Sequence, residues 1–232
     1  MSVKVVAYTL PTSKVEKDNG DGSFTLMGPD EFIAYVARVS NPSNQHNTET
    51  SDRLLKYLVK HKHWSPFEMA HVTMEINTTR DIARQILRHR SFSFQEFSQR
   101  YADPTNDLGF VHREARLQDT KNRQNSIESD NEQLQQEWKD KQWFITNVVR
   151  DTYEWAIDNG IAKEQARAVL PEGLTISRLY MAGSVRSWIH YCQLRCANGT
   201  QKEHQLIALE CWDELIKIYP SLNNLIDLDY YT

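Results

Sequence analysis

The most informative stretch of this sequence is RHRSFSFQEFSQR, which spans residues 88–100. It opens with three cationic or ionisable side chains and continues with serines, a glutamate and a further arginine among phenylalanines. So many charges and hydrogen-bond donors would make a poor core, because a buried unpaired charge is costly. The same composition suits a surface that grips an anionic, ring-bearing ligand, since arginine binds anionic oxygens through paired hydrogen bonds.

The residues before this stretch predict a strand followed by a helix. Residues 70–77 alternate between apolar and polar side chains, which is typical of a half-buried strand. The sequence TTRD at residues 78–81 resembles a capping box and predicts a helix over about 79–89. The periodicity of that helix would carry Arg90 onto its apolar side. We therefore expect either that the helix ends at His89 or that Arg90 is buried against an anion.

The spacing of polar residues predicts which of them share a face. On the predicted helix, Gln85 and His89 are one turn apart and lie away from the core stripe. Beyond the helix, Glu96, Ser98 and Arg100 are spaced by two residues. On an extended chain all three would point the same way.

The rest of the chain is expected to form an α+β fold in one domain covering residues 1–232, with a mixed or antiparallel sheet packed against long helices. The pattern predicts a buried strand at 3–10 and a hairpin or loop at 11–30, and it gives a polar insertion at 103–130. The other expected elements are a strand at 174–180 and helices at 29–39, 51–61, 131–158, 163–170, 183–197 and 201–219.

Composition excludes several classes of protein. The net charge of −4 argues against a general nucleic-acid binder, which needs a broad basic surface. No apolar run approaches the length of about 18 residues that crosses a bilayer, so we expect no membrane contact. The three cysteines, Cys192, Cys196 and Cys211, are too few and too clustered for a disulfide framework. We expect buried structural thiols and a reduced, cytoplasmic setting.

Two other interpretations of the polar residues are weaker. His61, His63 and His89, with Glu68 and His71 nearby, could be imagined as a metal site, but no helical ligand pair is present and no metal is expected. Serine nucleophiles are also disfavoured, because no Gly-x-Ser-x-Gly elbow surrounds the serines of 88–100. The arginines of this stretch could also form an ordinary solvated surface. The long pattern Arg-His-Arg-x2-Ser-x4-Ser-x-Arg argues against that simpler interpretation.

This pattern resembles the signature of the flavin-dependent thymidylate synthases. Arg88, His89, Arg90, Ser93, Ser98 and Arg100 all match it. The resemblance extends to residues 63–68, to Gln85, to 167–171 and to 186–195, and so covers most of the chain from about residue 50 onward.

The resemblance implies a specific reaction. Members of this family methylate dUMP to dTMP with methylenetetrahydrofolate as carbon donor, and release tetrahydrofolate. NADPH reduces a bound FAD, which supplies the hydride. The resemblance also implies a homotetramer whose active sites are shared between subunits. Arg195 matches the arginine proposed to stabilise ionised uracil, a form of electrostatic catalysis that requires no cysteine nucleophile.

The resemblance also assigns ligand contacts by matching position. Those to FAD would come from Ser65, Arg88, His89, Arg90, Glu96, Ser184, Val185, Arg186 and His190. Those to dUMP would come from Gln85, Arg88, Glu96, Phe97, Ser98, Gln99, Arg100, Arg167 and Arg195.

The sequence departs from the family pattern at two positions. Met69 stands where many relatives have a histidine, and Ser184 stands where asparagine is common. Two alternative classes stay open from the residues alone. One is a metal-dependent nucleotide hydrolase that uses His61, His63 and His89. The other is a non-catalytic nucleotide- or RNA-binding module that uses the arginines.

Overall fold

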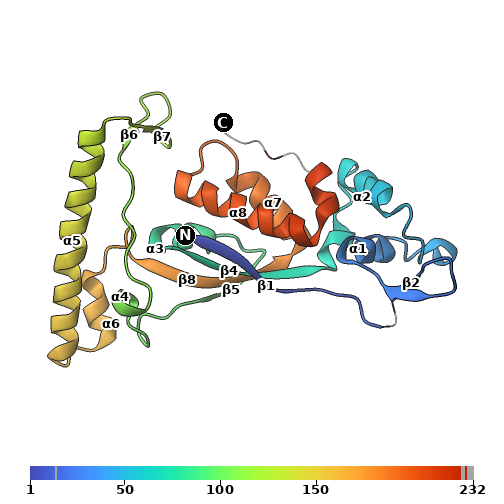
Figure 1. Ribbon diagram of the computed structural model, residues 1–232, viewed down its shortest axis with the longest axis horizontal. Coiled ribbons are helices and arrows are strands. Elements are labelled where there is room, and N and C mark those ends of the chain that lie inside the picture. The colour runs from blue at the N-terminus through green and yellow to red at the C-terminus, as the bar shows by residue number, and fades with distance from the viewer. Residues whose placement is uncertain (14, 226–227, 229–232) are drawn as a thin grey trace.

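A four-stranded antiparallel sheet forms the centre of the fold in the computed structural model, which describes residues 1–13, 15–225 and 228 (Figure 1). The strands lie in the order β1-β4-β8-β5, and each neighbouring pair is antiparallel. Their bounds are β1 Ser2–Tyr8, β4 His71–Thr79, β5 Ser93–Glu96 and β8 Ile176–Ser184. The predicted α+β class with an antiparallel sheet is therefore confirmed.

Two helices cover one face of this sheet, α7 (Val185–Arg195) and α8 (Lys202–Ile218) (Figure 1). Large side chains such as Trp188 and Met74 are fully buried between the helices and the sheet. Burying such side chains contributes roughly 1.5–3 kcal/mol each. The three cysteines are also buried and unpaired, as expected, and burial raises the pKa of the Cys196 thiol to about 12. They are therefore inert core residues.

The N-terminal part extends the layer of helices beyond the sheet. Helices α1 (Pro29–Ala37) and α2 (Ser51–Lys60) lie where the sequence predicted helices, and they pack on each other. The expected hairpin consists of β2 (Glu16–Asp18) and β3 (Phe24–Leu26). The prediction that β1 is buried was wrong, because β1 is an edge strand and most of its residues are exposed.

A long helix, α5 (Glu132–Asp158), stands at one end of the molecule, away from the sheet (Figure 1). It has a small core of its own, in which Tyr153 and Ala156 pack with Ala166 of α6 (Lys163–Ala166). The polar segment before it contains the short helix α4 (Pro104–Asp107) and a hairpin of β6 (Arg116–Gln118) and β7 (Ser126–Glu128). Short 3-10 helices complete the described chain: η1 Pro42–Asn44, η2 Ser65–Glu68, η3 Arg167–Val169 and η4 Pro220–Asn224.

Helix α3 (Arg80–Ile86) ends earlier than the predicted helix, which reached residue 89. The capping box is also absent. Thr79 is the N-cap residue, and the Asp81 carboxylate accepts hydrogen bonds from the Thr79 hydroxyl and the Arg113 guanidinium. Asp81 therefore does not cap the helix as predicted. It pairs instead with Arg113, a residue distant in sequence, at 2.7 Å. Among the described helices, none is both long and apolar enough to cross a membrane.

Candidate active site

Phe92 fixes the turn that leads from α3 into β5. Its ring packs edge-on against Trp188, with the centroids 4.9 Å apart, and also contacts Tyr191. The space for this ring exists only because residue 183 is glycine. A Cβ atom added at Gly183 would come within 2.5 Å of the Phe92 ring. This anchor holds the start of the signature stretch against α7.

Arg88 and Arg90 also lie in this turn, and unlike Phe92 both are exposed. Because α3 has already ended at Ile86, helical periodicity no longer carries Arg90 into the core. Of the two expectations for Arg90, burial is wrong, because Arg90 is exposed; the helix does end before Arg90, but at Ile86 and not at His89 as expected. Two exposed guanidinium groups next to a buried ring leave a cationic surface that can bind an anion.

His89, in the turn after α3, forms a hydrogen bond with Arg195 of α7. The Nε–H of Arg195, at the end of α7, donates to Nε2 of His89 at 2.9 Å. Burial first, and then the Arg195 charge, lower the pKa of His89 to about 4. The imidazole is therefore neutral at neutral pH. Since Nε2 accepts, its proton is on Nδ1. The contact joins a residue expected to bind the cofactor to one expected to bind the nucleotide.

Gln85 is held by residues that the sequence did not single out. Its amide lies between His204 and Gln201 of the α7–α8 region, at 3.2 Å and 2.8 Å. His204 is completely buried, three residues before the buried Ile207 on the apolar side of α8. An ionisable side chain on an otherwise apolar helix face was the signal that could have identified it.

A second polar cluster surrounds Glu68, the last residue of η2. The Glu68 carboxylate accepts from the Ser184 hydroxyl and from Arg186, both at 2.5 Å. Burial opposes ionisation of Glu68, but these two hydrogen bonds, together with the charges of Arg186 and His71, lower its pKa on balance. Ser184 is also the N-cap of α7, because its hydroxyl accepts from the Ser187 N–H. Asparagine is common at this position in the family. The serine of this chain has two structural partners, Glu68 and the Ser187 N–H.

Other residues expected to bind the cofactor lie around this cluster. Ser65, at the start of η2, is exposed. His190 is exposed and packs edge-on against Trp64 at 5.1 Å. Val185 is fully buried, and its N–H donates to the Ala70 carbonyl. Its side chain is therefore part of the core.

Glu96, at the end of β5, is paired within its own chain. Its carboxylate accepts from the Ser177 hydroxyl at 2.8 Å and lies 3.6 Å from Arg80. The strand ends here, so the expected extended run through Ser98 and Arg100 was wrong. The Phe97 N–H still donates to the backbone of β8, but the chain then turns, and the Tyr101 N–H donates to the Ser98 carbonyl at 3.1 Å.

The remaining nucleotide candidates lie next to α6. Arg100 is exposed and pairs with Glu164 at 3.3 Å, and half-buried Arg167 follows in η3. Ser98 is exposed, and its hydroxyl accepts from the Arg100 N–H at 3.4 Å. Among the described residues, no hydrogen bond or ion pair joins this group to Arg195. The chain carries anion-binding candidates both next to α6 and around Arg195.

Comparison with known proteins identifies the family. A family profile described as "Thymidylate synthase complementing protein" matches residues 24–221. A probable flavin-dependent thymidylate synthase of Paramecium bursaria Chlorella virus 1 is 47% identical over 98% of this chain and 99% of its own length. The flavin-dependent thymidylate synthase of Synechocystis is 44% identical over 96% and 97% of the two chains. This chain belongs to the flavin-dependent thymidylate synthase family.

A solved structure also shares the fold. The UMP/dUMP methylase PolB from Streptomyces cacaoi, bound with 5-Br dUMP, has a TM-score of 0.74 and is 23% identical. The match covers 97% of this chain and 95% of that one. At this identity the likeness establishes only the arrangement of helices and strands, which this member of the flavin-dependent thymidylate synthase family shares over the matched part of the chain.

Membership of the flavin-dependent thymidylate synthase family implies a flavin cofactor, and unpaired polar groups in the described residues fit one. Arg186 Nε and Gln99 Nε2 are buried and have no hydrogen-bond partner there. Buried donors are nearly always satisfied, so a bound ligand could supply the partner that each of these lacks. Together with the exposed guanidinium groups of Arg88 and Arg90, they suit an anionic ligand such as a flavin dinucleotide.

The histidines of the metal hypothesis have other contacts. The His61 and His63 rings both pack against Tyr57, at 4.3 Å and 6.0 Å. In the part of the chain that the structure describes, no group of three or more histidine, cysteine or acidic side chains is arranged to hold a metal. The family assignment favours the flavin enzyme over both the metal-dependent hydrolase and the non-catalytic binding module.

Proposed function

We propose that this protein methylates dUMP to dTMP, using methylenetetrahydrofolate as carbon donor and NAD(P)H-reduced FAD as hydride source. Tetrahydrofolate is the second product. The observation that carries this proposal is the match to flavin-dependent thymidylate synthases over nearly their whole length. It is supported by the complete arginine–histidine–serine pattern of residues 88–100, whose His89 contacts Arg195.

The nucleotide is held at its phosphate and at its base. Arg100 and Arg167 bind the phosphate as bidentate donors, helped by the Ser98 hydroxyl and by backbone groups of residues 96–100. Arg88 adds a further cation. The uracil ring lies near Gln85 and Arg195. The pairing of Arg100 with Glu164 is an exposed ion pair, which costs little to exchange for a phosphate.

Arg195 is the catalytic residue. Its guanidinium, always charged, stabilises the negative charge that develops on uracil when the ring ionises. Ionised uracil has greater electron density at the carbon to be alkylated, so no side chain needs to attack the ring. Neutral His89 orients this guanidinium by accepting its Nε–H and leaves the terminal nitrogens available for the base.

The cofactor is held by groups of the turn after α3 and of the region around η2 and α7. Arg88 and Arg90 neutralise its pyrophosphate, and Arg186 offers its unpaired Nε. The other contacts come from Ser65, His89, Glu96, Ser184, the backbone of Val185, and His190. When bound, FAD supplies the hydride that completes the methyl group.

The active enzyme is a homotetramer, and each site draws residues from more than one chain. Two features of the single chain support this. One set of anion-binding candidates lies beside α6, where Arg100 pairs with Glu164, and another lies around the His89–Arg195 contact, and no hydrogen bond or ion pair links the two sets among the described residues. The standing helix α5 also exposes large apolar side chains, including Trp143, Phe144 and Trp155, which are typical of a protein interface. We place this tetramer in the cytoplasm, where its buried thiols stay reduced.

The direct test is whether the purified full chain binds FAD and makes dTMP. We expect a yellow protein with a flavin absorbance spectrum, which converts dUMP to dTMP when supplied with NADPH and methylenetetrahydrofolate. A colourless preparation that also fails to take up added FAD would contradict the proposal.

Ser98→Ala is expected to keep measurable methylation, with a rise in the KM for dUMP of up to about tenfold. The reason is that Ser98 contributes one hydrogen bond to the nucleotide and is not a nucleophile. Steady-state kinetics with dUMP varied will measure the effect. If Ser98→Ala binds dUMP normally but makes no dTMP, Ser98 takes part in the chemistry.

A further inference from the structure

The amide of Gln85 is held at both of its ends. Its Nε2 donates to Gln201 Oε1 at 2.8 Å, and its Oε1 lies 3.2 Å from Nδ1 of His204. A primary amide has two N–H donors and two acceptor lone pairs. One N–H and one lone pair of Gln85 therefore stay available for a ligand, in a fixed orientation.

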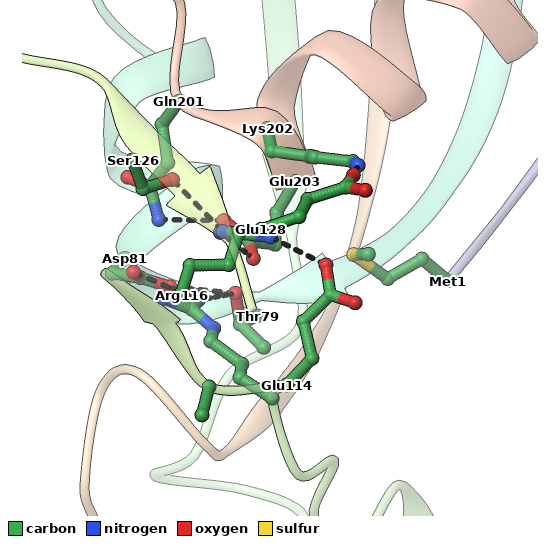
Figure 2. A network of polar contacts seen from close by, with 12 residues as sticks. Met1, Thr79, Asp81, Glu114, Arg116, Ser126, Glu128, Gln201, Lys202 and Glu203 are labelled. Atoms are coloured by element: carbon green, nitrogen blue, oxygen red, sulfur yellow. Dashed lines mark hydrogen bonds and ion pairs between the residues drawn. The ribbon is translucent and has the colours of Figure 1, made fainter. Parts of the chain in front are cut away.

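The orientation of this amide can be traced to a buried carboxylate. Glu203 accepts from Gln201 Nε2 at 2.9 Å and forms an ion pair with Arg116. Figure 2 shows this network, in which Arg116 of β6 also binds Ser126 and Glu114. Burial opposes ionisation of Glu203, but hydrogen bonds from Gln201 and Arg116 lower its pKa on balance. An ionised carboxylate only accepts hydrogen bonds, so Gln201 must direct its nitrogen toward Glu203.

The remaining directions then follow one from the next. Since the Gln201 nitrogen faces Glu203, its oxygen faces Gln85 and accepts from the Gln85 nitrogen. The Gln85 oxygen consequently faces His204 and requires a proton on Nδ1.

Tyr191 is the last residue of this chain of hydrogen bonds, on the far side of His204 from Gln85. Its hydroxyl lies 3.1 Å from Nε2 of His204. Burial, followed by the Arg195 charge, lowers the pKa of His204 to about 3, so the ring carries a single proton. Because that proton is on Nδ1, Nε2 accepts from the Tyr191 hydroxyl, and burial keeps this hydroxyl protonated by raising its pKa. Gln201, Gln85 and His204 each donate one hydrogen bond and accept one, between Glu203, which only accepts, and the Tyr191 hydroxyl, which donates.

We propose that His204 is a positioning residue that, with Gln201 and Glu203, fixes the Gln85 amide in the orientation that recognises the uracil nucleotide. The inference rests on the proposed function, because it takes dUMP to be the ligand of Gln85. His204 acts through Gln85 and is fully buried, so it does not touch the nucleotide itself.

The first experiment measures dUMP binding to the FAD-loaded full chain by isothermal titration calorimetry. We expect His204→Leu to raise the Kd for dUMP about tenfold, since the Gln85 amide loses the hydrogen bond that orients it. His204→Asn is the matched control, because its side-chain N–H lies close to the position of Nδ1. This variant should restore most of the affinity. Equal affinity of His204→Leu and the wild type would overturn the proposal.

A double-mutant cycle separates positioning from a general structural effect. In a Gln85→Ala background, where there is no amide to orient, His204→Leu should change the Kd for dUMP by less than about twofold. A purely structural role would give the same factor in both backgrounds, and that result would overturn the proposal. If His204→Leu does not fold, Gln201→Leu removes the other partner of Gln85 and should satisfy the same cycle.

The wild-type protein distinguishes the two hypotheses. If it binds dUMP and makes dTMP while the His204 and Gln201 variants match it, only the positioning role fails. If the wild type does not bind dUMP, the proposed function fails, and with it the role assigned to the Gln85 amide.

Discussion

Replacing Arg195 by alanine is expected to lower the rate of dTMP formation about a thousandfold, the scale for losing a group that stabilises developing charge. The protein should still bind FAD. Arg195 provides the cation proposed to stabilise ionised uracil, whereas the flavin is held mainly by residues of the turn after α3 and of the η2 region. His89 loses a hydrogen bond in this variant but keeps its edge-on packing against Tyr191.

The measurement is single-turnover formation of dTMP together with the flavin absorbance of the purified variant. Arg195→Lys is the matched control. It keeps the positive charge but loses the planar fork, so its rate should lie between those of Arg195→Ala and the wild type. A variant that makes no dTMP because it has lost its flavin would move Arg195 from the catalytic role to cofactor binding.

The sequence predicted most elements because their signals are local. The amphipathic pattern of residues 131–158 and the alternation of residues 70–77 are each complete within one segment, and α5 and β4 lie there. The end of α3 was not predictable in this way. The turn that follows α3 places the Phe92 ring against Gly183, a contact between residues about ninety positions apart that a local pattern does not reveal. The exposed edge of β1 likewise depends on strand order, which composition does not reveal.

For the candidate site too, the sequence identified some residues and missed others. The resemblance selected His89 and Arg195, and the structure brings them within a hydrogen bond of each other. His204 was missed because its role is created by a partner 119 residues away. A histidine at that place in the sequence differs from an ordinary helix residue only in lying on an apolar face. Contacts between distant segments, rather than residue types, decide which polar groups support the site.

Mixing two inactive variants is expected to restore activity if the sites are shared between subunits. In a tetramer assembled at random from Arg88→Ala and Arg195→Ala chains, a site that takes Arg88 from one chain and Arg195 from another has both residues in about one quarter of cases. We therefore expect co-expressed, differently tagged chains to recover about a quarter of wild-type turnover after both tags have been used for purification.

The contact between His89 and Arg195 provides the control for this experiment. These residues are 2.9 Å apart within one chain, so they belong to the same site whatever the assembly. Mixing His89→Ala with Arg195→Ala should then restore nothing, because no site contains both intact residues. Recovery in the Arg88 mixture but not in the His89 mixture would establish that neighbouring residues of one turn serve different active sites. Lack of recovery in verified mixed tetramers of Arg88→Ala and Arg195→Ala would mean instead that each chain builds its site alone.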